Sequence, residues 1–311
     1  MTTTANPTLD PTIDKPSRPR RWIPLSLRMF VAMLALLGMA GGWVGVRGYQ
    51  QLMAIREIDR LGGTSHLEPA GPKWLRPRLG DEWTDMFDKV IVVSLFGTNA
   101  DDETLRQLDR MVELDTLTLD STQVTGAGLV HLKGLSNLRL LSLRNTLADD
   151  AGLSHLKGLT SLRVLGLGNT TVTDSGLVHL EAFTTLQGLD LENTHVADEG
   201  LLHLRGLTKV QYLYLEYTHV TDRGLAHLKG LSRLERLELC STRVTDDGLA
   251  HLAGLTSLKM IGLESTHVTD AGLTHLKGLT RLESLSLYDT PVTDAGVADL
   301  KGTLPRLEIF R

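Results

Sequence analysis

Histidine and aspartate recur at fixed positions within repeated segments of this chain. Residues 266–280 read THVTDAGLTHLKGLT, and residues 218–232 read THVTDRGLAHLKGLS. A regular pairing of imidazole and carboxylate could bind a metal ion or relay protons. Seven histidines occupy the same place in this pattern: His131, His155, His179, His203, His227, His251 and His275.

The regular spacing itself argues against that chemistry. If each copy forms its own short outer helix, successive histidines lie too far apart to share one ion. We therefore expect each histidine to be a half-buried helix residue that bonds to the adjacent turn. We expect each aspartate to begin a helix, where its charge complements the helix dipole. The pattern indicates architecture and predicts no metal.

A second candidate for chemistry is a pair of carboxylates in the middle of the chain. Glu192 and Glu216 occupy the same register in adjacent copies, with His195 and His219 close by in sequence. Paired carboxylates can hydrolyse glycosides, and with histidine they can hold a divalent ion. An open sheet surface, however, offers no pocket that would raise the pKa of one carboxylate. We therefore predict a non-catalytic protein without a cofactor.

The elements that position these residues repeat with a period of 24 residues. The general form is LxxLxLxxTxVTDxGLxHLKGLTx. A diverged first copy begins at Val90, and a partial strand follows the last full copy. Full copies begin at Leu114, Leu138, Leu162, Leu186, Val210, Leu234, Leu258 and Leu282.

Over residues 90–311 this pattern resembles the leucine-rich repeat family. The whole layout is similar to membrane-anchored leucine-rich repeat proteins of planctomycete-type bacteria. The resemblance implies an α/β solenoid, a horseshoe with a parallel concave β-sheet and short convex helices. It implies architecture more than a defined activity.

The residues themselves lead to the same fold. Alternation directs the fourth and sixth residues of each copy inward, as at Leu165 and Leu167. Thr173 and Asp174 are typical of a helix start, and Leu177 points back to the core. The ninth residue of every copy is threonine, whose hydroxyl can satisfy buried backbone groups of successive turns. No copy can bury its leucines alone, so neighbouring copies stabilise one another.

Binding function should lie where the copies differ, on the strand surface. Tyrosine combines apolar area with a hydrogen-bonding tip and commonly anchors interfaces. Earlier copies are more basic, with Arg139, Arg144 and Arg163. We predict a site for a protein or peptide of basic character, or alternatively a solvated acidic face without a specific partner. The candidate residues, all expected to face outward, are Asp190, Glu192, Tyr212, Tyr214, Glu216, Tyr217, Glu238 and Glu264.

Cys240 lies in the same field and is the only cysteine of the chain. A single cysteine excludes an internal disulfide framework and a cysteine-rich zinc module. The neighbouring glutamates would oppose its thiolate, so we expect an unreactive thiol. A different function is also open: the array could be an envelope scaffold that acts by self-association.

Charge is unevenly distributed along the 311 residues, which carry a net charge of −5. Residues 1–28 hold five basic and two acidic side chains, a net charge of +3, which leaves −8 for the remainder. A nucleic-acid-binding protein would show a basic stripe instead. We therefore expect no nucleic-acid partner.

Residues 29–46 carry no charge and, as a helix, would span about 27 Å, near the thickness of the bilayer hydrocarbon. We predict a single-pass transmembrane signal anchor after a polar, basic tail at residues 1–28. The excess of basic residues before the span favours a cytoplasmic N-terminus and an exported repeat domain. A cleaved signal peptide ending near residues 38–40 and a buried core helix are the alternatives, and the 28-residue leader is long for a signal peptide.

Between the span and the repeats, we predict a juxtamembrane helix over residues 47–63 that stops at Gly62 and Gly63. Residues 64–89 should form a linker and an N-terminal cap. Three prolines mark the linker. An apolar helical face with Trp83, Met86, Phe87 and Val90 should cover the open start of the array.

Overall fold

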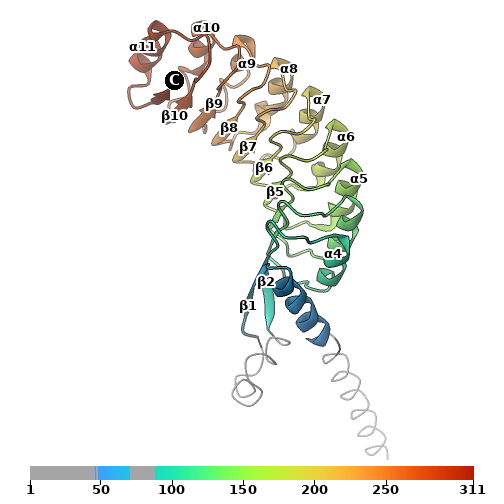
Figure 1. The fold of residues 1–311 in the computed structure, drawn as a ribbon. Helices are drawn as coiled ribbons and strands as arrows, with labels where there is room; N and C mark the ends of the chain where they lie inside the picture. Colours follow the sequence, from blue (N-terminus) through green and yellow to red (C-terminus); the bar gives the residue numbers. More distant parts are fainter. Residues whose placement is uncertain (1–45, 47, 71–87) are drawn as a thin grey trace, which may run out of the picture. The chain divides into compact units, whose positions relative to one another are not determined.

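The computed structural model describes residue 46, residues 48–70 and residues 88–311. Residues 47–311 form one compact unit built from stacked coils (Figure 1). Within the described residues, eleven strands form one sheet in chain order, β1 to β11. β2 to β11 pair in parallel, and successive partners such as Leu165 and Leu189 are one period apart. The strands line the inner side of the arc, and the helices lie on its outer side (Figure 1).

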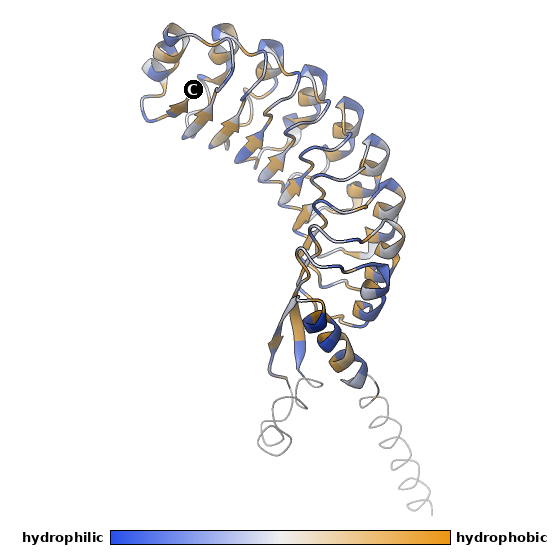
Figure 2. Ribbon diagram, viewed as in Figure 1, coloured by the Kyte–Doolittle hydropathy of each residue, from blue (hydrophilic) through white to orange (hydrophobic). Residues whose placement is uncertain are grey.

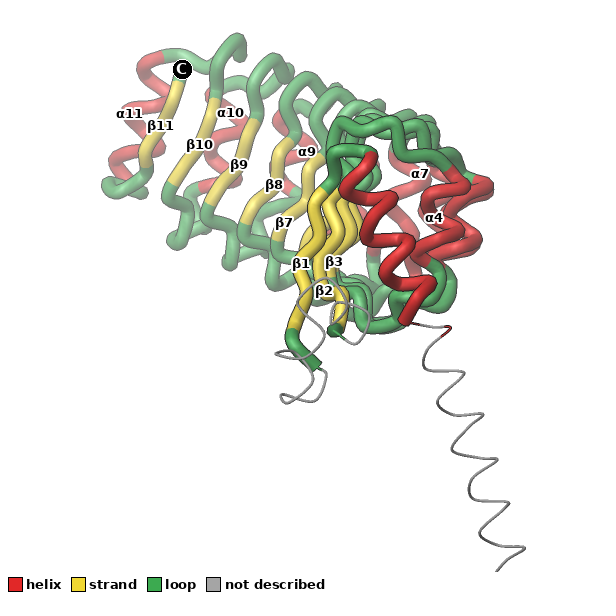
Figure 3. The backbone as a smooth tube through the Cα atoms, turned by 60° about the horizontal axis from the view of Figure 1, so that its bottom comes forward, coloured by secondary structure: helices red, strands yellow, loops and turns green. Residues whose placement is uncertain are grey.

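The strands that form this sheet are short after β2. Their bounds are β1 Thr64–Glu68, β2 Lys89–Ser94, β3 Thr116–Thr118, β4 Leu140–Ser142, β5 Val164–Gly166, β6 Gly188–Asp190, β7 Tyr212–Tyr214, β8 Arg236–Glu238, β9 Met260–Gly262, β10 Ser284–Ser286 and β11 Glu308–Phe310. Figure 3 shows β1 to β3 and β7 to β11 side by side along one face.

The core is a column of leucines that the sheet and the outer turns enclose. Leu165, Leu167 and Leu177 are fully buried, as their places in the repeat predict. Phe183 replaces the usual leucine of its coil and is also buried. Figure 2 shows the apolar character of the strands and the more polar outer surface of the helices. Each coil buries its leucines against its neighbours, so stability depends on stacking.

The outer turns combine single α-turns with 3₁₀ turns. The α-helices are α4 Asp102–Leu108, α5 Asp150–Leu153, α6 Asp174–Leu177, α7 Asp198–Leu201, α8 Asp222–Leu225, α9 Asp246–Ala250, α10 Asp270–Leu273 and α11 Asp294–Thr303. The 3₁₀ turns are η1 Ala127–Leu132, η2 Ser154–Gly158, η3 Val178–Ala182, η4 Leu202–Leu204, η5 Ala226–Gly230 and η6 Thr274–Leu276. η1 has no α-turn before it, because Gly126 stands where other coils have aspartate and supplies no side-chain cap.

The recurring aspartate bonds to the next coil as well as beginning a helix. Asp222 accepts hydrogen bonds from the backbone N–H of Thr245 at 2.8 Å and from its hydroxyl at 2.7 Å. Asp150 and Thr173 are joined in the same way. A carboxylate that accepts both bonds locks the helix starts of adjacent coils together. This ladder is the structural reason for the repeated aspartate.

The ninth-position threonines bond within their own coils. The Thr170 hydroxyl donates to the carbonyl oxygen of Leu167 at 2.6 Å, and Thr194 donates to that of Leu191 at 2.7 Å. The threonine hydroxyls therefore satisfy buried backbone carbonyls, as predicted. These hydrogen bonds do not join successive coils, because each hydroxyl donates to the carbonyl oxygen three residues earlier in its own coil.

A helix packs against the start of the array. Residues 48–60 are helical, and Leu52, Ile55 and Ile58 are buried on the side that packs toward the first coil. The turn that follows places Gly62 at φ +84°, a conformation that favours glycine. This helix therefore covers the open start. Trp83, Met86 and Phe87 of the predicted cap lie outside the described residues, and Val90 lies in strand β2, so its predicted place on a helical face is wrong.

The predicted linker also contains regular structure. Residues 64–68 form β1, which pairs antiparallel with β2 and extends the sheet. Exposed and half-buried side chains alternate over Thr64–Glu68, as in a strand at the edge of a sheet. The prolines that follow led to the prediction of a linker instead. Among the described residues, no helix has the length and apolar character needed to span a bilayer. The predicted span at 29–46 lies outside that part of the chain except for Val46.

Candidate functional site

The eight predicted site residues all lie on or beside the concave sheet, but their exposure differs. Tyr212 and Tyr217 are 41% and 59% exposed, as expected for contact residues. Asp190 and Glu238 lie on the same face but are buried. The remaining residues, Glu192, Tyr214, Glu216 and Glu264, are half-buried. Arginines from this same face cover the two buried carboxylates.

Arg144 covers Asp190. Its guanidinium pairs with Asp190 and with Glu192, two strands further along the sheet. The side chain crosses the intervening coil above Gly166 and Gly168, where a Cβ at Gly168 would lie 3.2 Å from Arg144 Cζ. The glycines keep this path open. Asp190 and Glu192 therefore share one partner within the chain. The sequence did not indicate this pairing, because Arg144 lies two repeats earlier.

Arg236 covers Glu238. Its Nε donates to Glu238 Oε1 at 2.7 Å, and its guanidinium carbon lies 5.3 Å from the centre of the Tyr214 ring. Tyr214 is thus held by a cation–π contact as well as by its strand. This arrangement leaves Tyr212 and Tyr217 as the exposed tyrosines of the field.

Glu216 lies at the centre of the field without such a partner. Its Oε2 is buried and has no hydrogen-bond partner in the described part of the chain. Burial, together with the charges of Glu238 and Glu192, raises the pKa of Glu216 to about 7. This carboxyl therefore changes charge near neutral pH, whereas a solvated glutamate is fully ionised there.

A hollow of about 390 Å³ opens beside Glu216 on the concave face. Five of the predicted residues line it: Glu192, Glu216, Tyr217, Glu238 and Glu264. Asp190, Tyr212 and Tyr214 do not. Sequence reasoning missed the contributions of Arg236, Met260 and Gly262, which come from third and fifth positions of neighbouring coils. Because third and fifth positions of each repeat face the concave surface, the repeat pattern could have indicated these three residues.

Cys240 also lines the hollow, and its thiol is half-buried. Burial, with the charges of Glu238 and Glu264, raises the pKa of this thiol to about 11. The thiolate is the nucleophilic form, so this environment makes Cys240 unreactive at neutral pH. The predicted unreactive thiol agrees with this geometry.

Two of the seven recurring histidines, His203 and His227, bond to the preceding coil and so have a structural role. Nδ1 of His203 lies 2.6 Å from Glu181 Oε1, and that of His227 lies 2.5 Å from Arg205 Nη2, each a bond to the preceding coil. His155 and His275 are exposed, so the expectation of half-buried histidines is wrong there. His195 and His219 approach with ring centres 6.5 Å apart. Throughout the described ranges, no three His, Cys, Asp or Glu side chains are grouped to hold a metal ion.

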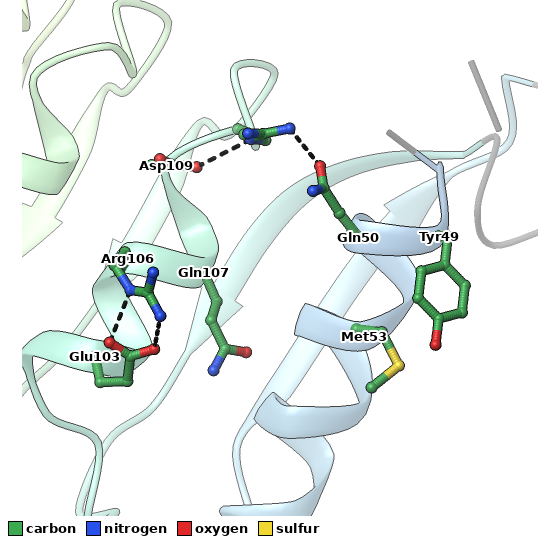
Figure 4. Close-up of a pocket in the computed structure, with 8 residues that line it drawn as sticks. Tyr49, Gln50, Met53, Glu103, Arg106, Gln107 and Asp109 are labelled. Carbon is green, nitrogen blue, oxygen red and sulfur yellow. Dashed lines mark hydrogen bonds and ion pairs between the residues drawn. The ribbon is translucent and has the colours of Figure 1, made fainter. Parts of the chain in front are cut away.

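Another hollow of about 430 Å³ lies between helix 48–60 and α4. Figure 4 shows Tyr49 and Met53 on the N-terminal helix and Glu103, Arg106 and Gln107 on the neighbouring α4. The charges that line the hollow are internally paired: Glu103 with Arg106, and Asp109 with Arg110. This hollow therefore has no charge left over to select a partner. The concave hollow is the better candidate site.

Comparison with solved structures adds a likeness of fold. The leucine-rich-repeat ectodomain of the plant membrane receptor kinase GASSHO1/SCHENGEN3 from Arabidopsis thaliana superposes with a TM-score of 0.55 at 19% identity. The alignment covers 83% of this chain and 32% of that chain, so the protein spans about a third of the ectodomain's length. That ectodomain was crystallised in complex with CASPARIAN STRIP INTEGRITY FACTOR 2.

An internalin C2 from Listeria monocytogenes aligns over 72% of this chain and 85% of its own, with 24% identity and a TM-score of 0.45. No family model matches the sequence, and no curated protein does. The superposition on the plant ectodomain agrees with the 24-residue coil, the parallel sheet and the leucine column described above. The chain has the fold of leucine-rich repeat proteins.

Proposed function

We propose that the protein binds a protein or peptide partner of basic character on its concave face and has no catalytic role. The observation that carries this proposal is the combination of two exposed tyrosines, Tyr212 and Tyr217, with a hollow lined by four glutamates. Aromatic side chains supply contact area at interfaces. An acidic surface steers a basic partner and disfavours an acidic one. The plant ectodomain of the same fold, in complex with its factor, supports binding as the role.

The test is capture of a partner from an envelope extract by the immobilised full chain. Tyr212→Ala combined with Glu216→Ala should abolish capture, because it removes an aromatic contact and the central carboxylate. Val178→Ala combined with Glu181→Ala is a matched control on the outer turn η3, where both side chains are exposed. Equal capture by both double variants and the wild type would remove the proposal.

We also propose that residues 29–46 anchor the chain in a membrane, with the N-terminus cytoplasmic and the repeats exported. The uncharged 18-residue stretch and the basic leader support this arrangement. Alkaline carbonate extraction should leave the full chain with the membranes. Protease added outside intact spheroplasts should degrade the repeats. Release by carbonate or protection from protease would contradict the anchor or its orientation, respectively.

A further inference from the structure

The hollow on the concave face has an unbalanced set of charges. Glu238 is paired with Arg236, and Glu264 accepts a hydrogen bond from the Ser286 hydroxyl at 2.5 Å. Glu192 is paired with Arg144. Glu216 alone among the four glutamates has a buried carboxylate oxygen without a partner in the residues described. The hollow therefore contains a carboxylate oxygen, Glu216 Oε2, that accepts no hydrogen bond from the described residues.

Gly262 of β9 is one of the residues that line the hollow. A Cβ added at Gly262 would lie 1.8 Å from Glu238 Oε2 and 3.0 Å from Cys240 Sγ. Glycine at this position therefore makes room for the Glu238 carboxylate, which occupies the space above it. Met260 and Tyr217 provide apolar walls at the edges of the same hollow. A ligand with a slender apolar stem and a charged end matches these surfaces.

Elsewhere on the concave face, an arginine of the chain itself pairs with two carboxylates. Arg144 lies over Gly166 and Gly168 and ends between Asp190 and Glu192. A guanidinium fork matches two carboxylates because its N–H groups point in fixed directions. The hollow at Gly262 is likewise lined by carboxylates. Arg236 also lines it and pairs with Glu238, whereas among the described residues Glu216 and Glu264 have no basic side chain in an ion pair with them.

We propose that this hollow receives an arginine side chain of the partner, whose guanidinium pairs with Glu216 and Glu264. The inference rests on the proposed binding function and specifies its partner as an arginine-containing peptide segment. An organic cation suits the hollow better than a metal ion, because within the described ranges no three potential ligands are grouped around one point. The arginine stem lies against Met260 and Tyr217, which a bare ion would leave uncovered.

A random dodecapeptide library selected on the detergent-solubilised full chain supplies a probe. Selected peptides should share one arginine, and each is resynthesised with citrulline, a neutral analogue of similar shape, in its place. Fluorescence anisotropy should show at least about tenfold weaker binding of the citrulline peptide to the wild type, the scale expected for a charge-assisted hydrogen bond. In Glu216→Gln/Glu264→Gln the arginine and citrulline peptides should bind within about threefold of each other.

Glu283→Gln is the matched control, because Glu283 lies outside the hollow and should preserve the full difference between arginine and citrulline. Denaturation midpoints of all variants establish that they fold. Selected peptides without arginine that still depend on Tyr212 would overturn the arginine site and leave concave binding standing. Peptides that bind wild type and Tyr212→Ala/Glu216→Ala equally would overturn both proposals. A library that yields no enriched peptide also overturns the arginine site.

Discussion

The Arg144 guanidinium pairs with Asp190, although 46 residues and one complete coil separate the two. The contact depends on the intervening coil, where Gly166 and Gly168 leave no side chain in the path. Three neighbouring coils therefore act as one unit: the first supplies the cation, the second the open path and the third the carboxylate. The concave face is organised by such contacts between coils as well as by the backbone of the sheet.

Arg144→Gln should lower the free energy of unfolding by about 1–2 kcal/mol, because it leaves buried Asp190 without its cation while part of the lost attraction is screened by solvent. Arg163→Gln, a neighbouring exposed arginine, is the control and should change stability by less than about 0.5 kcal/mol. Urea unfolding monitored by circular dichroism measures both. Equal midpoints for the two variants would show that the Asp190 pair contributes nothing.

The sequence predicted the fold because the fold depends on periodic burial. Leu165 and Leu167 are buried, while outward positions of the strands such as Val164 and Tyr212 are exposed, as alternation requires. The parallel register follows directly, since each coil repeats the same residue places. The concave placement of the candidate residues followed from the same rule.

The sequence did not reveal which of those residues would be covered. Asp190 is buried by an arginine from a coil two periods earlier, and no local pattern encodes the reach of that side chain. Residues 48–60 pack on the first coil through Leu52 and Ile58, although their spacing equally suited a helix that only leaves a membrane. Long-range packing decided both cases.

Gly248 is required by its contact with the previous coil. A Cβ there would lie 2.3 Å from Asp222 Oδ1, the atom that accepts the Thr245 N–H bond. Gly248→Ala should therefore destabilise the protein by about 1–3 kcal/mol. Gly254→Ala, in the same coil but with open space around it, should stay within about 1 kcal/mol of wild type or stabilise slightly. Thermal unfolding distinguishes them, and similar melting temperatures would contradict the close packing.

Tyr217 has φ +56°, the left-handed conformation that asparagine or serine holds at the equivalent position of neighbouring coils. A bulky residue is disfavoured there, and 59% of the side chain is exposed, so little packing offsets the strain. Tyr217→Asn should therefore raise the free energy of unfolding by about 1 kcal/mol. It should also weaken partner capture, because the aromatic wall is lost. Asn193→Tyr, the reverse change one coil earlier, should destabilise. A less stable Tyr217→Asn variant would show that the ring contributes more by packing than its conformation costs.

Glu216 should make both stability and binding depend on pH. Burial and the charges of Glu238 and Glu192 raise its pKa in the folded state to about 7, while Arg236 acts in the opposite direction. A carboxyl with a raised folded pKa contributes stability that is full below its unfolded value of 4.5 and is lost as pH rises through about 7. Between pH 5 and pH 8 the wild type should therefore lose about 1–2 kcal/mol relative to Glu216→Gln, a figure reduced for partial exposure.

Urea unfolding of both proteins at each pH measures this difference, and all other titrating groups cancel in the comparison. Glu283→Gln should follow the wild type. Over the same range, affinity for an arginine peptide should rise with pH, because the ionised Glu216 is the form that accepts the guanidinium. Stability curves that stay parallel from pH 5 to pH 8 would show that Glu216 keeps an ordinary pKa, and its buried oxygen would then need a partner that compensates its charge.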